Sequence, residues 1–438
     1  MEETTYRELL RILRSEVKPA LGCTGPIGVC YCAAQAYDAV RGGQVQKIIA
    51  KLDWGFGTKI DDVAFPGTRM LGAEMAVAMG AMCGNPALGL ELLRDVTPEM
   101  EEKAREIAEL VEIQPQWDRT DLGFFADITI ATDRGTGRAV VMERSDGLVL
   151  KERDGIAVEK HEPDPSAQQA KSPILKYKVR DFYTFADEAK AEDLDFIRTA
   201  AQYNMLLADT TIEKHLGAGI GATLYRDQNA NSITHAKAYA AAGCEARMSG
   251  VNHPAMSCGN KGNVGIAASV PLVSLARDLK IPEEKMLRAI AVSYLTAISV
   301  IHRIGKSPAV CACEIAACLG ITAGATFLRG GTAQQMENAI QCAIPSMFGV
   351  VCDGARLACA LRISSGTGVG IEASDLALAG VKIANNQGVL AWNADQSIDL
   401  IGHTALFGMV DSDRALGRQL FEKRKIFPLQ SFDERQEQ

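Results

Sequence analysis

The chain has 438 residues, of which 47% are hydrophobic and 23% charged, a composition typical of a globular protein with room for two or three domains. Its formal net charge is -8, and no stripe of lysine and arginine with interleaved aromatic residues occurs. This charge pattern argues against binding to a phosphate backbone. We therefore expect a small-molecule ligand and no nucleic-acid partner.

The N-terminal segment is charged and lacks the basic-then-apolar run of a secretory signal, which predicts a cytoplasmic protein. In a reducing compartment its twelve cysteines are expected to be thiols or metal ligands rather than disulfides. Residues 308–328 have nearly the length of a membrane span, but Glu314 and the glycines of this stretch favour a buried core helix. We therefore expect no membrane partner.

Two helices are predicted near the N-terminus. Apolar residues at helical spacing over residues 5–20 predict the first helix, which Pro19 ends. A Gly-Cys-Thr-Gly-Pro turn at residues 22–26 precedes a second helix over 27–40. Cys23 therefore lies beside a helix N-terminus, where backbone N–H groups and the helix dipole favour a thiolate. This is a suitable position for a reactive cysteine.

An α/β module follows. Residues 45–53 predict a strand, and residues 127–132 and 139–144 alternate as two more strands joined by a glycine-containing turn. Helices are predicted between them over 72–82 and 98–111.

The remainder of the chain is predicted to be almost entirely helical, with apolar runs at 266–279, 287–300, 310–328 and 339–351. Helices that are apolar on most faces are buried by other helices. We therefore expect an α+β multidomain fold. It would comprise an N-terminal helical segment (1–44) that carries Cys23 and packs on the C-terminal domain, an inserted α/β module (45–190), and a mainly all-α domain (191–438).

Three cysteines of the helical domain are candidate metal ligands. Forty residues separate Cys311 from Cys352, and six separate Cys352 from Cys359. Cysteine thiolates hold iron–sulfur clusters, and three protein ligands leave one iron open as a Lewis acid. Cysteine is also a common core residue, and the spacing alone favours packing cysteines. Zinc is less well supported, because no Cys-x-x-Cys pair or nearby histidine pair completes a tetrahedral set.

Asn260 lies in a polar, glycine-containing turn at residues 256–263, just before an apolar helix. Backbone N–H groups at such a helix start can hold a substrate carboxylate, and an ordinary helix-start loop fits the sequence equally well. The six histidines show no close pairing. The sequence also contains neither a nucleotide-binding glycine motif nor the Gly-x-Ser-x-Gly elbow of a serine hydrolase.

Five motifs, taken in order along the chain, resemble the L-cysteine desulfidase family, whose members are relatives of the iron–sulfur L-serine dehydratases. They are Pro-Ala-Leu-Gly-Cys-Thr-Gly-Pro at 19–26, Pro-Gly-Thr at 66–68, Gly-Asn-Lys-Gly at 259–262, Cys-Ala-Cys-Glu at 311–314, and Val-Cys-Asp-Gly-Ala at 351–355 with Cys359 after it. The resemblance covers nearly the whole chain.

This resemblance implies a lyase with a [4Fe-4S] cluster held by Cys311, Cys352 and Cys359. It implies that Cys23 is the general base at Cα, where the serine dehydratases have a histidine. The module at 45–190 resembles the β-chain-like, substrate-sensing domain of serine dehydratases. The substrate-binding residues carried over from the family are Thr24, Thr68 and Asn260.

The expected reaction is β-elimination of a small amino acid, with L-cysteine giving pyruvate, ammonia and hydrogen sulfide. Three positions depart from the desulfidase pattern, namely Gly25, Cys258 and Lys261. The alternatives are an L-serine dehydratase-like deaminase and a non-catalytic amino-acid-binding homologue. Cys313 is a rival ligand to Cys311, although Glu314 matches the Cys-x-x-Glu of serine dehydratases and favours Cys311. A homo-oligomer is expected.

Overall fold

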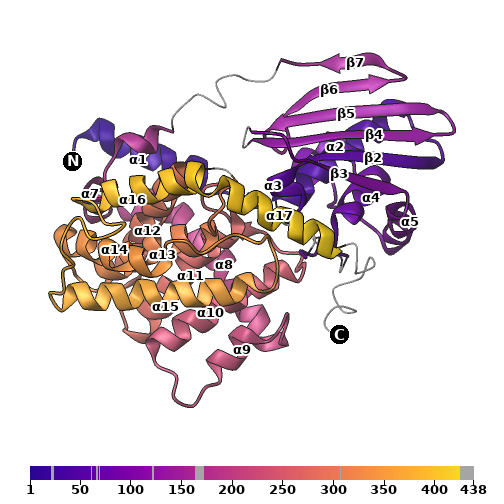
Figure 1. Ribbon diagram of the computed structural model, residues 1–438. Coiled ribbons are helices and arrows are strands. Elements are labelled where there is room, and N and C mark those ends of the chain that lie inside the picture. The colour runs from indigo at the N-terminus through magenta and orange to yellow at the C-terminus, as the bar shows by residue number, and fades with distance from the viewer. Residues whose placement is uncertain are drawn as a thin grey trace. The chain divides into compact units, whose positions relative to one another are not determined.

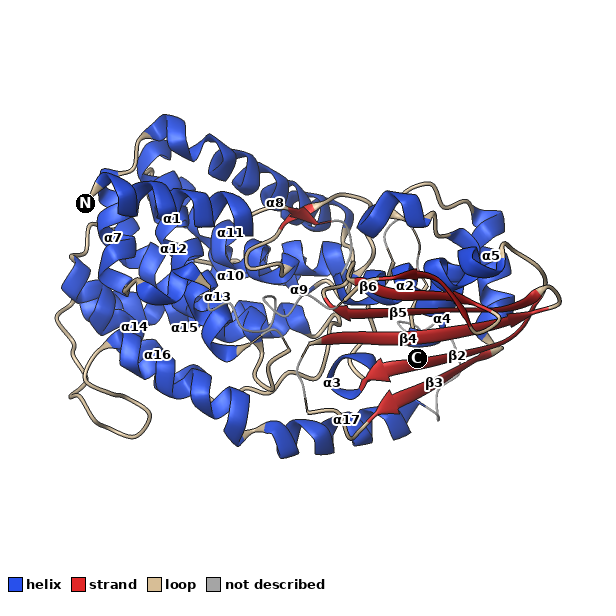
Figure 2. Cartoon of the chain, turned by 90° about the horizontal axis from the view of Figure 1, so that it is seen from above, coloured by secondary structure: helices blue, strands red, loops and turns tan. Residues whose placement is uncertain are grey.

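The computed structural model describes residues 1–20, 24–60, 62–65, 68, 70–120, 123–162, 172–305 and 307–424. The chain forms two compact units. Unit 1 comprises residues 1–20, 171–352 and 357–411, and unit 2 comprises residues 21–170, 353–356 and 412–438. Unit 1 is built mainly from helices, and the long strands belong to unit 2 (Figures 1 and 2). The protein thus has an α+β fold, as predicted.

Unit 2 contains a six-stranded mixed sheet with the strand order β3-β2-β4-β5-β6-β7. Neighbours β2 and β3 are parallel, and the other pairs are antiparallel. The strands are β2 (Val45–Asp53), β3 (Val111–Gln116), β4 (Phe124–Thr132), β5 (Gly135–Glu143), β6 (Leu148–Arg153) and β7 (Ile156–Lys160).

The helices of unit 2 are α2 (Thr24–Val40), α3 (Trp54–Gly57), α4 (Ala73–Cys83), η1 (Pro86–Glu91), α5 (Pro98–Ala108) and most of α17 (Val410–Arg424). Because β2 and β3 run parallel, the chain must cross over between them, and α4 and α5 lie in that crossover. The buried residues of β2 and β4 share one core cluster with those of α2 and α4.

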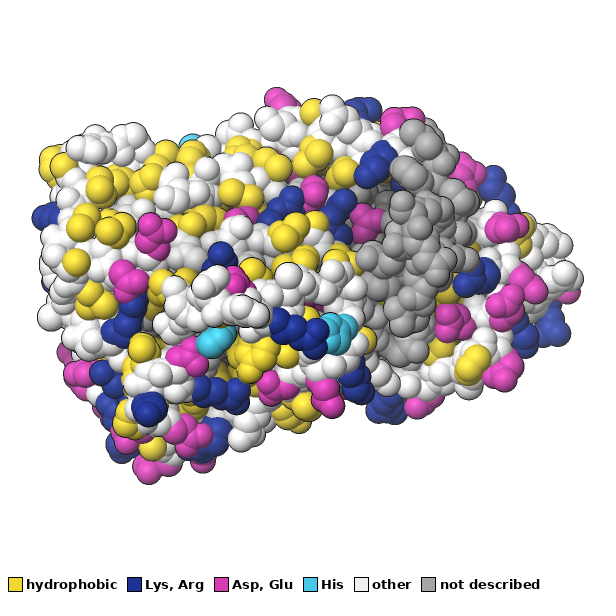
Figure 3. Space-filling view, turned by 90° about the horizontal axis from the view of Figure 1, so that it is seen from below, with side chains coloured by type: hydrophobic (Ala, Val, Ile, Leu, Met, Phe, Trp, Pro, Cys, Tyr) yellow, Lys and Arg dark blue, Asp and Glu magenta, His cyan; other side chains and the backbone are white. Residues whose placement is uncertain are grey.

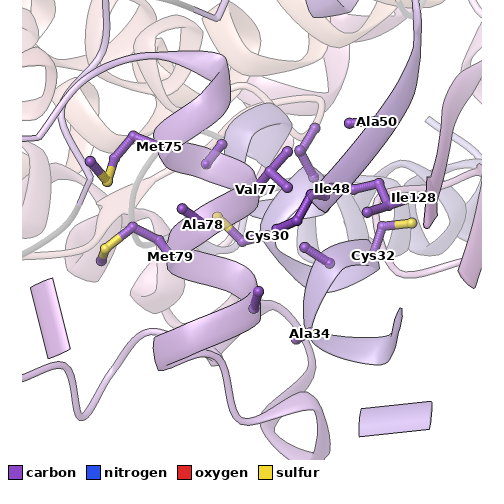
Figure 4. Packing of buried hydrophobic residues seen from close by; sticks show 14 of the residues in the cluster. Cys30, Cys32, Ala34, Ile48, Ala50, Met75, Val77, Ala78, Met79 and Ile128 are labelled. Carbon is purple, nitrogen blue, oxygen red and sulfur yellow. The ribbon is translucent and has the colours of Figure 1, made fainter. Parts of the chain in front are cut away.

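Helix α2 lies between α4 and the sheet. Cys30 lies at the side of α2 that meets α4, and Cys32 lies at the side toward Ile128 of β4 (Figure 4). The Cys32 thiol donates to the carbonyl oxygens of Ala126 and Ala139 at 3.4 and 3.3 Å. Gly80 permits the close approach of α4, since a Cβ there would lie 2.1 Å from the Cys30 carbonyl oxygen.

Unit 2 therefore begins before α2, whereas the sequence placed a boundary at residue 44. The difference arises because α2 is apolar on most of its surface, and the inner face of the sheet covers the side that α4 leaves open.

The strands β3, β6 and β7 of the sheet were not predicted. Only Ile113 of β3 is buried. Every residue of β6 is only partly buried, and every residue of β7 is exposed, so neither strand carries the period-two burial pattern of an inner strand.

Unit 1 begins with α1 (Glu3–Glu16) and the short strand β1 (Pro19–Ala20), which pairs with β8 (Ala255–Met256). Its other elements are η2 (Pro173–Lys176), α7 (Val179–Glu188), η3 (Ala191–Leu194), α8 (Asp195–Lys214), α9 (Ile220–Tyr225), α10 (Ser232–Met248), α11 (Gly262–Asp278), α12 (Glu283–Ile304), α13 (Ala312–Leu328), α14 (Ala333–Met347), α15 (Cys359–Leu378), α16 (Ala394–His403) and η4 (Thr404–Gly408).

Helix α13 is the buried helix that the apolar run predicted. All of its residues except Cys313 are buried. Gly320 and Gly324 allow close packing, since a Cβ at either position would lie under 3 Å from a carbonyl oxygen of α12. Among the described residues, α12 alone is long and apolar enough to cross a membrane, and 83% of its apolar window is buried inside the structure. This burial is typical of a core helix.

Candidate functional site

The helices α13 and α15 meet along two faces that carry polar and thiol side chains. Cys311 is the N-cap of α13, and Glu314 and Cys318 follow it at helical spacing. On α15 the corresponding face begins with Cys359 and continues with Arg362 and Gly366. The two glycines of this face, at 366 and 370, bring α15 onto the Glu314 and Cys318 turns, where an added Cβ would lie 3.3 Å from the Cγ of Glu314 and 2.9 Å from the Cys318 carbonyl oxygen.

Cys352 is brought to the start of α13 by a backbone bridge between Val310 and Val351. The backbone N–H of Cys311 donates to the Val350 carbonyl at 2.8 Å, and that of Cys352 donates to the Ala309 carbonyl at 2.8 Å. These two hydrogen bonds hold the backbones of Cys311 and Cys352 side by side, although forty residues separate them in the sequence.

The thiols of Cys311 and Cys359 both lie within electrostatic range of Cys244 on α10. Burial is the main reason that the pKa of the Cys244 thiol lies well above its usual value, and Cys359 and Cys311 raise it further. A hydrogen bond with Cys313, followed by burial, raises the pKa of the Cys311 thiol. In the absence of a bound cation, these surroundings therefore keep both Cys244 and Cys311 protonated.

No group of three or more His, Cys, Asp and Glu side chains within the described ranges is arranged to hold a metal ion. The chemistry of the donor set nevertheless fits a thiolate-bound cluster. Cys311 and Cys359 are 2% and 3% exposed, Cys352 is held beside Cys311, and all three belong to unit 1.

Glu314 is an unusual buried residue. It is 5% exposed, and its Oε2 atom accepts no hydrogen bond from any described part of the chain. Burial raises the pKa of Glu314 to about 7, and the charge of Arg362 on α15 opposes that rise. The fold thus places an unsatisfied carboxylate oxygen one helical turn after Cys311.

Asn260 is exposed and lies at the tip of a tight turn in which Lys261 N–H donates to the Cys258 carbonyl at 3.1 Å. The two central residues, Gly259 and Asn260, have φ of 58° and 59°, as a type I′ turn requires. Helix α11 starts directly after this turn. Cys258 itself is fully buried, and its thiol donates to the Tyr294 carbonyl at 3.7 Å, so it serves the core of unit 1.

Cys23 lies outside the described residues, and of Thr24 only the backbone is described, as the first residue of α2. The chain that leads to Cys23 is fixed within unit 1. Ala20 pairs with Ala255, and the Lys18 carbonyl accepts hydrogen bonds from the backbone and side chain of Ser257 at 2.8 Å. The segment before Cys23 is therefore tied to the loop that leads to Asn260.

Thr68 belongs to unit 2 and is 5% exposed. Its hydroxyl donates to the Phe65 carbonyl at 3.3 Å and accepts from the Met70 N–H at 3.2 Å. These two bonds stabilise the turn that contains Thr68, so substrate binding by this residue stays a prediction.

A pocket of about 450 Å³ opens on unit 2, with Tyr31, Gln35, Arg144 and His161 among its lining residues. None of the predicted site residues that the structure describes lines it.

The sequence did not single out Arg362 or Gly366, and it suggested only a packing role for Cys244. Arg362 and Gly366 could have been found from their positions three and seven residues after Cys359, which place all three on one face of a helix.

The protein has an α+β fold, and its helical unit carries Cys311 and Cys359 at the starts of α13 and α15, with the backbone of Cys352 beside that of Cys311. A family model described as the serine dehydratase alpha chain matches residues 87–416. The chain also matches a UPF0597 protein of Clostridium tetani, 31% identical over 410 residues and covering 93% of this chain and 96% of the relative. UPF0597 proteins of Desulfatibacillum aliphaticivorans and Photobacterium profundum are each 32% identical, covering 94% of this chain and 98% of the relative.

The chain therefore belongs to the serine dehydratase alpha chain family. This membership agrees with the broader relationship that the sequence motifs indicated.

Proposed function

We propose that the protein is an iron–sulfur lyase that eliminates the β-substituent of a small L-amino acid. L-cysteine is the favoured substrate, and pyruvate, ammonia and hydrogen sulfide are the products. The single observation that carries the proposal is that the backbone of Cys352 lies beside that of Cys311, while Cys311 and Cys359 both act on the Cys244 thiol. Membership in the serine dehydratase alpha chain family supports the class of reaction.

Cys311, Cys352 and Cys359 would hold a [4Fe-4S] cluster. When bound, a cluster with three protein ligands supplies an open iron that acts as a Lewis acid and makes a thiol or hydroxyl a better leaving group. The three thiols would bind as thiolates. Because the pKa of the Cys311 thiol is raised in the protein, cluster binding would release a proton from Cys311.

Cys23 is the proposed general base. It directly precedes the first residue of α2, and a helix N-terminus favours a thiolate. Its Sγ takes the proton from Cα, the Cβ–S bond breaks, and the electron pair leaves with the sulfide. The resulting 2-aminoacrylate takes up water and gives pyruvate and ammonia.

The substrate contacts are proposed to come from Thr24, Thr68 and Asn260. The tight turn around Asn260 precedes the N-terminus of α11, a 17-residue helix whose first N–H groups can hold a carboxylate. The protein is further proposed to act in the cytoplasm as a homo-oligomer, without nucleic-acid or membrane partners.

The second candidate is deamination of L-serine or another β-substituted amino acid. The family model itself is named for serine dehydratase, and Gly25 replaces the glutamate of the desulfidase motif. The two candidates share the same residues and differ only in the leaving group.

Protein purified without oxygen and reconstituted with iron and sulfide would be assayed for pyruvate with L-cysteine and with L-serine. We expect turnover of both pyruvate and sulfide with L-cysteine, its loss in Cys23→Ala, and its retention in the control Cys342→Ala on α14. Faster turnover of L-serine would favour the second candidate, and inactivity with both substrates would contradict the proposed function.

A further inference from the structure

Glu314 has a buried carboxylate oxygen without a hydrogen-bond partner among the described residues. Its Oε2 atom is buried and accepts no hydrogen bond among the described residues, in a side chain that is 95% removed from solvent. A buried acceptor without a partner lowers stability, so folded proteins rarely keep one without a reason. A ligand that donates a hydrogen bond to this atom would remove the cost.

The surroundings of Glu314 indicate where such a ligand would lie. The Glu314 side chain packs against α15 at Gly366, where an added Cβ would lie 3.3 Å from its Cγ, so the two helices are in close contact at that level. Cys311 lies one turn before Glu314 on α13, and Cys359 lies two turns before Gly366 on α15. The unsatisfied oxygen and the thiols thus share one end of the same helix pair.

Arg362 adds a second charge at this place. It lies on the same face of α15 between Cys359 and Gly366, and its charge acts on both Cys311 and Glu314. A ligand bound beside Glu314 would face a carboxyl group and lie in the field of a guanidinium group, a pair that complements a zwitterion.

We propose that Oε2 of Glu314 accepts a hydrogen bond from the α-ammonium group of the amino-acid substrate and so selects amino acids over carboxylic acids of the same size. This proposal rests on the proposed function in that it places the substrate beside the thiols of unit 1. Hydrogen bonds to charged groups change affinity by about tenfold or more, so one such bond is sufficient for selection.

The test compares two ligands that differ only in the ammonium group and carry no leaving group, namely L-alanine and propionate. Their dissociation constants would be measured by calorimetry on the parent, on Glu314→Gln and on Glu314→Asp. We expect the parent to prefer L-alanine. Glu314→Gln should lose about tenfold or more in L-alanine affinity while propionate binding stays unchanged. Glu314→Asp keeps the carboxyl group, but the shorter side chain moves its oxygens away from the ligand. This variant should therefore also lower the preference for L-alanine over propionate.

Glu337→Gln is the matched control. Glu337 is a buried glutamate of the same unit, but Arg180 donates to both of its oxygens, at 2.5 and 2.9 Å. This variant should melt at a lower temperature and keep the parent's preference for L-alanine. Glu314→Gln should melt no lower than the parent, because it replaces an unsatisfied carboxylate.

An unchanged preference in both Glu314 variants, an equal loss of both ligands, or a parent that binds neither ligand would overturn the proposal. The assignment can be separated from the proposed function. A parent that prefers L-alanine through Glu314 but makes no pyruvate from L-cysteine or L-serine would contradict only the lyase reaction.

Discussion

Cys311 and Cys313 are two residues apart in the sequence, but they differ in burial and in their neighbours. Cys311 is the N-cap of α13 and is 2% exposed, whereas Cys313 is the one residue of α13 that is not buried. Only Cys311 is shown beside the backbone of Cys352 and close enough to Cys244 to act on its thiol. We therefore assign the ligand role to Cys311 and leave Cys313 as a neighbour.

This assignment predicts opposite results for two serine variants. After anaerobic reconstitution, Cys311→Ser should bind much less iron than the parent, because one of three thiolate ligands is missing. Cys313→Ser should bind as much iron as the parent. Chemical analysis of iron per folded chain measures both, and the reverse pattern would show that Cys313 is the ligand.

At the scale of elements, the packing of α15 depends on which of its glycines faces another helix. Gly370 faces the backbone of α13, where an added Cβ would lie 2.9 Å from the Cys318 carbonyl oxygen. Gly368 faces the flexible side chain of Lys237, with its nearest atom at 3.4 Å. Both lie inside the helix, so they have the same backbone requirement and different surroundings.

We predict that Gly370→Ala lowers the free energy of unfolding by about 1–3 kcal/mol through overpacking. Gly368→Ala should raise it by up to about 1 kcal/mol, because alanine is the better helix former and finds room. Urea unfolding of both variants measures these changes. Equal effects at the two positions would contradict the contact described for α13 and α15.

Helix α17 packs on unit 2 through one buried ion pair and an aromatic cluster. Lys59 Nζ and Asp413 Oδ1 are 2.5 Å apart, and both side chains are almost fully buried. Trp54 stacks on Trp117, whose ring meets the edge of Phe421. Burial raises the pKa of Asp413, and Lys59 offsets only part of that rise. Desolvation of Asp413 therefore outweighs its attraction to Lys59.

From this balance we predict that Lys59→Met is destabilising by about 3–5 kcal/mol at neutral pH, because it leaves a buried carboxylate alone. The double variant Lys59→Met with Asp413→Leu should recover the parent's stability. The pKa of Asp413 is higher in the folded than in the unfolded protein. Its contribution to the free energy of unfolding is therefore greatest below its usual pKa of 3.8 and falls as the pH rises through the pKa of the folded state. Urea unfolding between pH 4 and 8 should therefore show this fall in the parent and lose it in the double variant. If Asp413→Leu does not restore the stability lost in Lys59→Met, desolvation of Asp413 does not outweigh its attraction to Lys59.

The sequence predicted the elements that have a strong pattern. The strand at 45–53 agrees with β2, and the predicted helices at 72–82 and 98–111 agree with α4 and α5 within three residues at each end. It did not predict β3, β6 and β7. Only one residue of β3 is buried, and the side chains of β6 and β7 are exposed or half-buried, so none of the three strands carries a clear alternation. It also grouped α17 with the helical domain, because a local pattern does not show which partner a helix will meet.

The candidate site was predictable in part. The five motifs identified the cysteines. Neither the spacing nor the composition of these motifs showed that an isolated β-bridge between Val310 and Val351 would place Cys352 beside Cys311. Glu314 could be noticed only as a motif match. That its Oε2 atom lacks a partner within the described chain depends on the packing of α13 against α15, which the sequence does not encode locally.

At the scale of the whole molecule, the chain passes between its two units several times. Residues 353–356 and 412–438 belong to unit 2, although unit 1 lies on both sides of the first segment in sequence. A division into consecutive domains could not foresee this. The first change from unit 1 to unit 2 falls after Ala20, just before the Gly-Cys-Thr-Gly-Pro motif at residues 22–26 of the sequence.

Charged side chains of both signs lie on the surface of the protein (Figure 3). The net charge is -8, and acidic and basic side chains are interspersed on the face shown in Figure 3. A small-molecule ligand and the absence of a nucleic-acid partner stay predictions from the sequence.

Three thiols of unit 1 are proposed to hold an iron–sulfur cluster. Iron and acid-labile sulfide, measured per folded chain after anaerobic purification and reconstitution, test this proposal most directly. We expect about four of each per chain, as a [4Fe-4S] cluster requires, and loss of both in the triple variant of Cys311, Cys352 and Cys359 to serine. A folded parent that takes up no iron, or a triple variant that takes up as much as the parent, would contradict it.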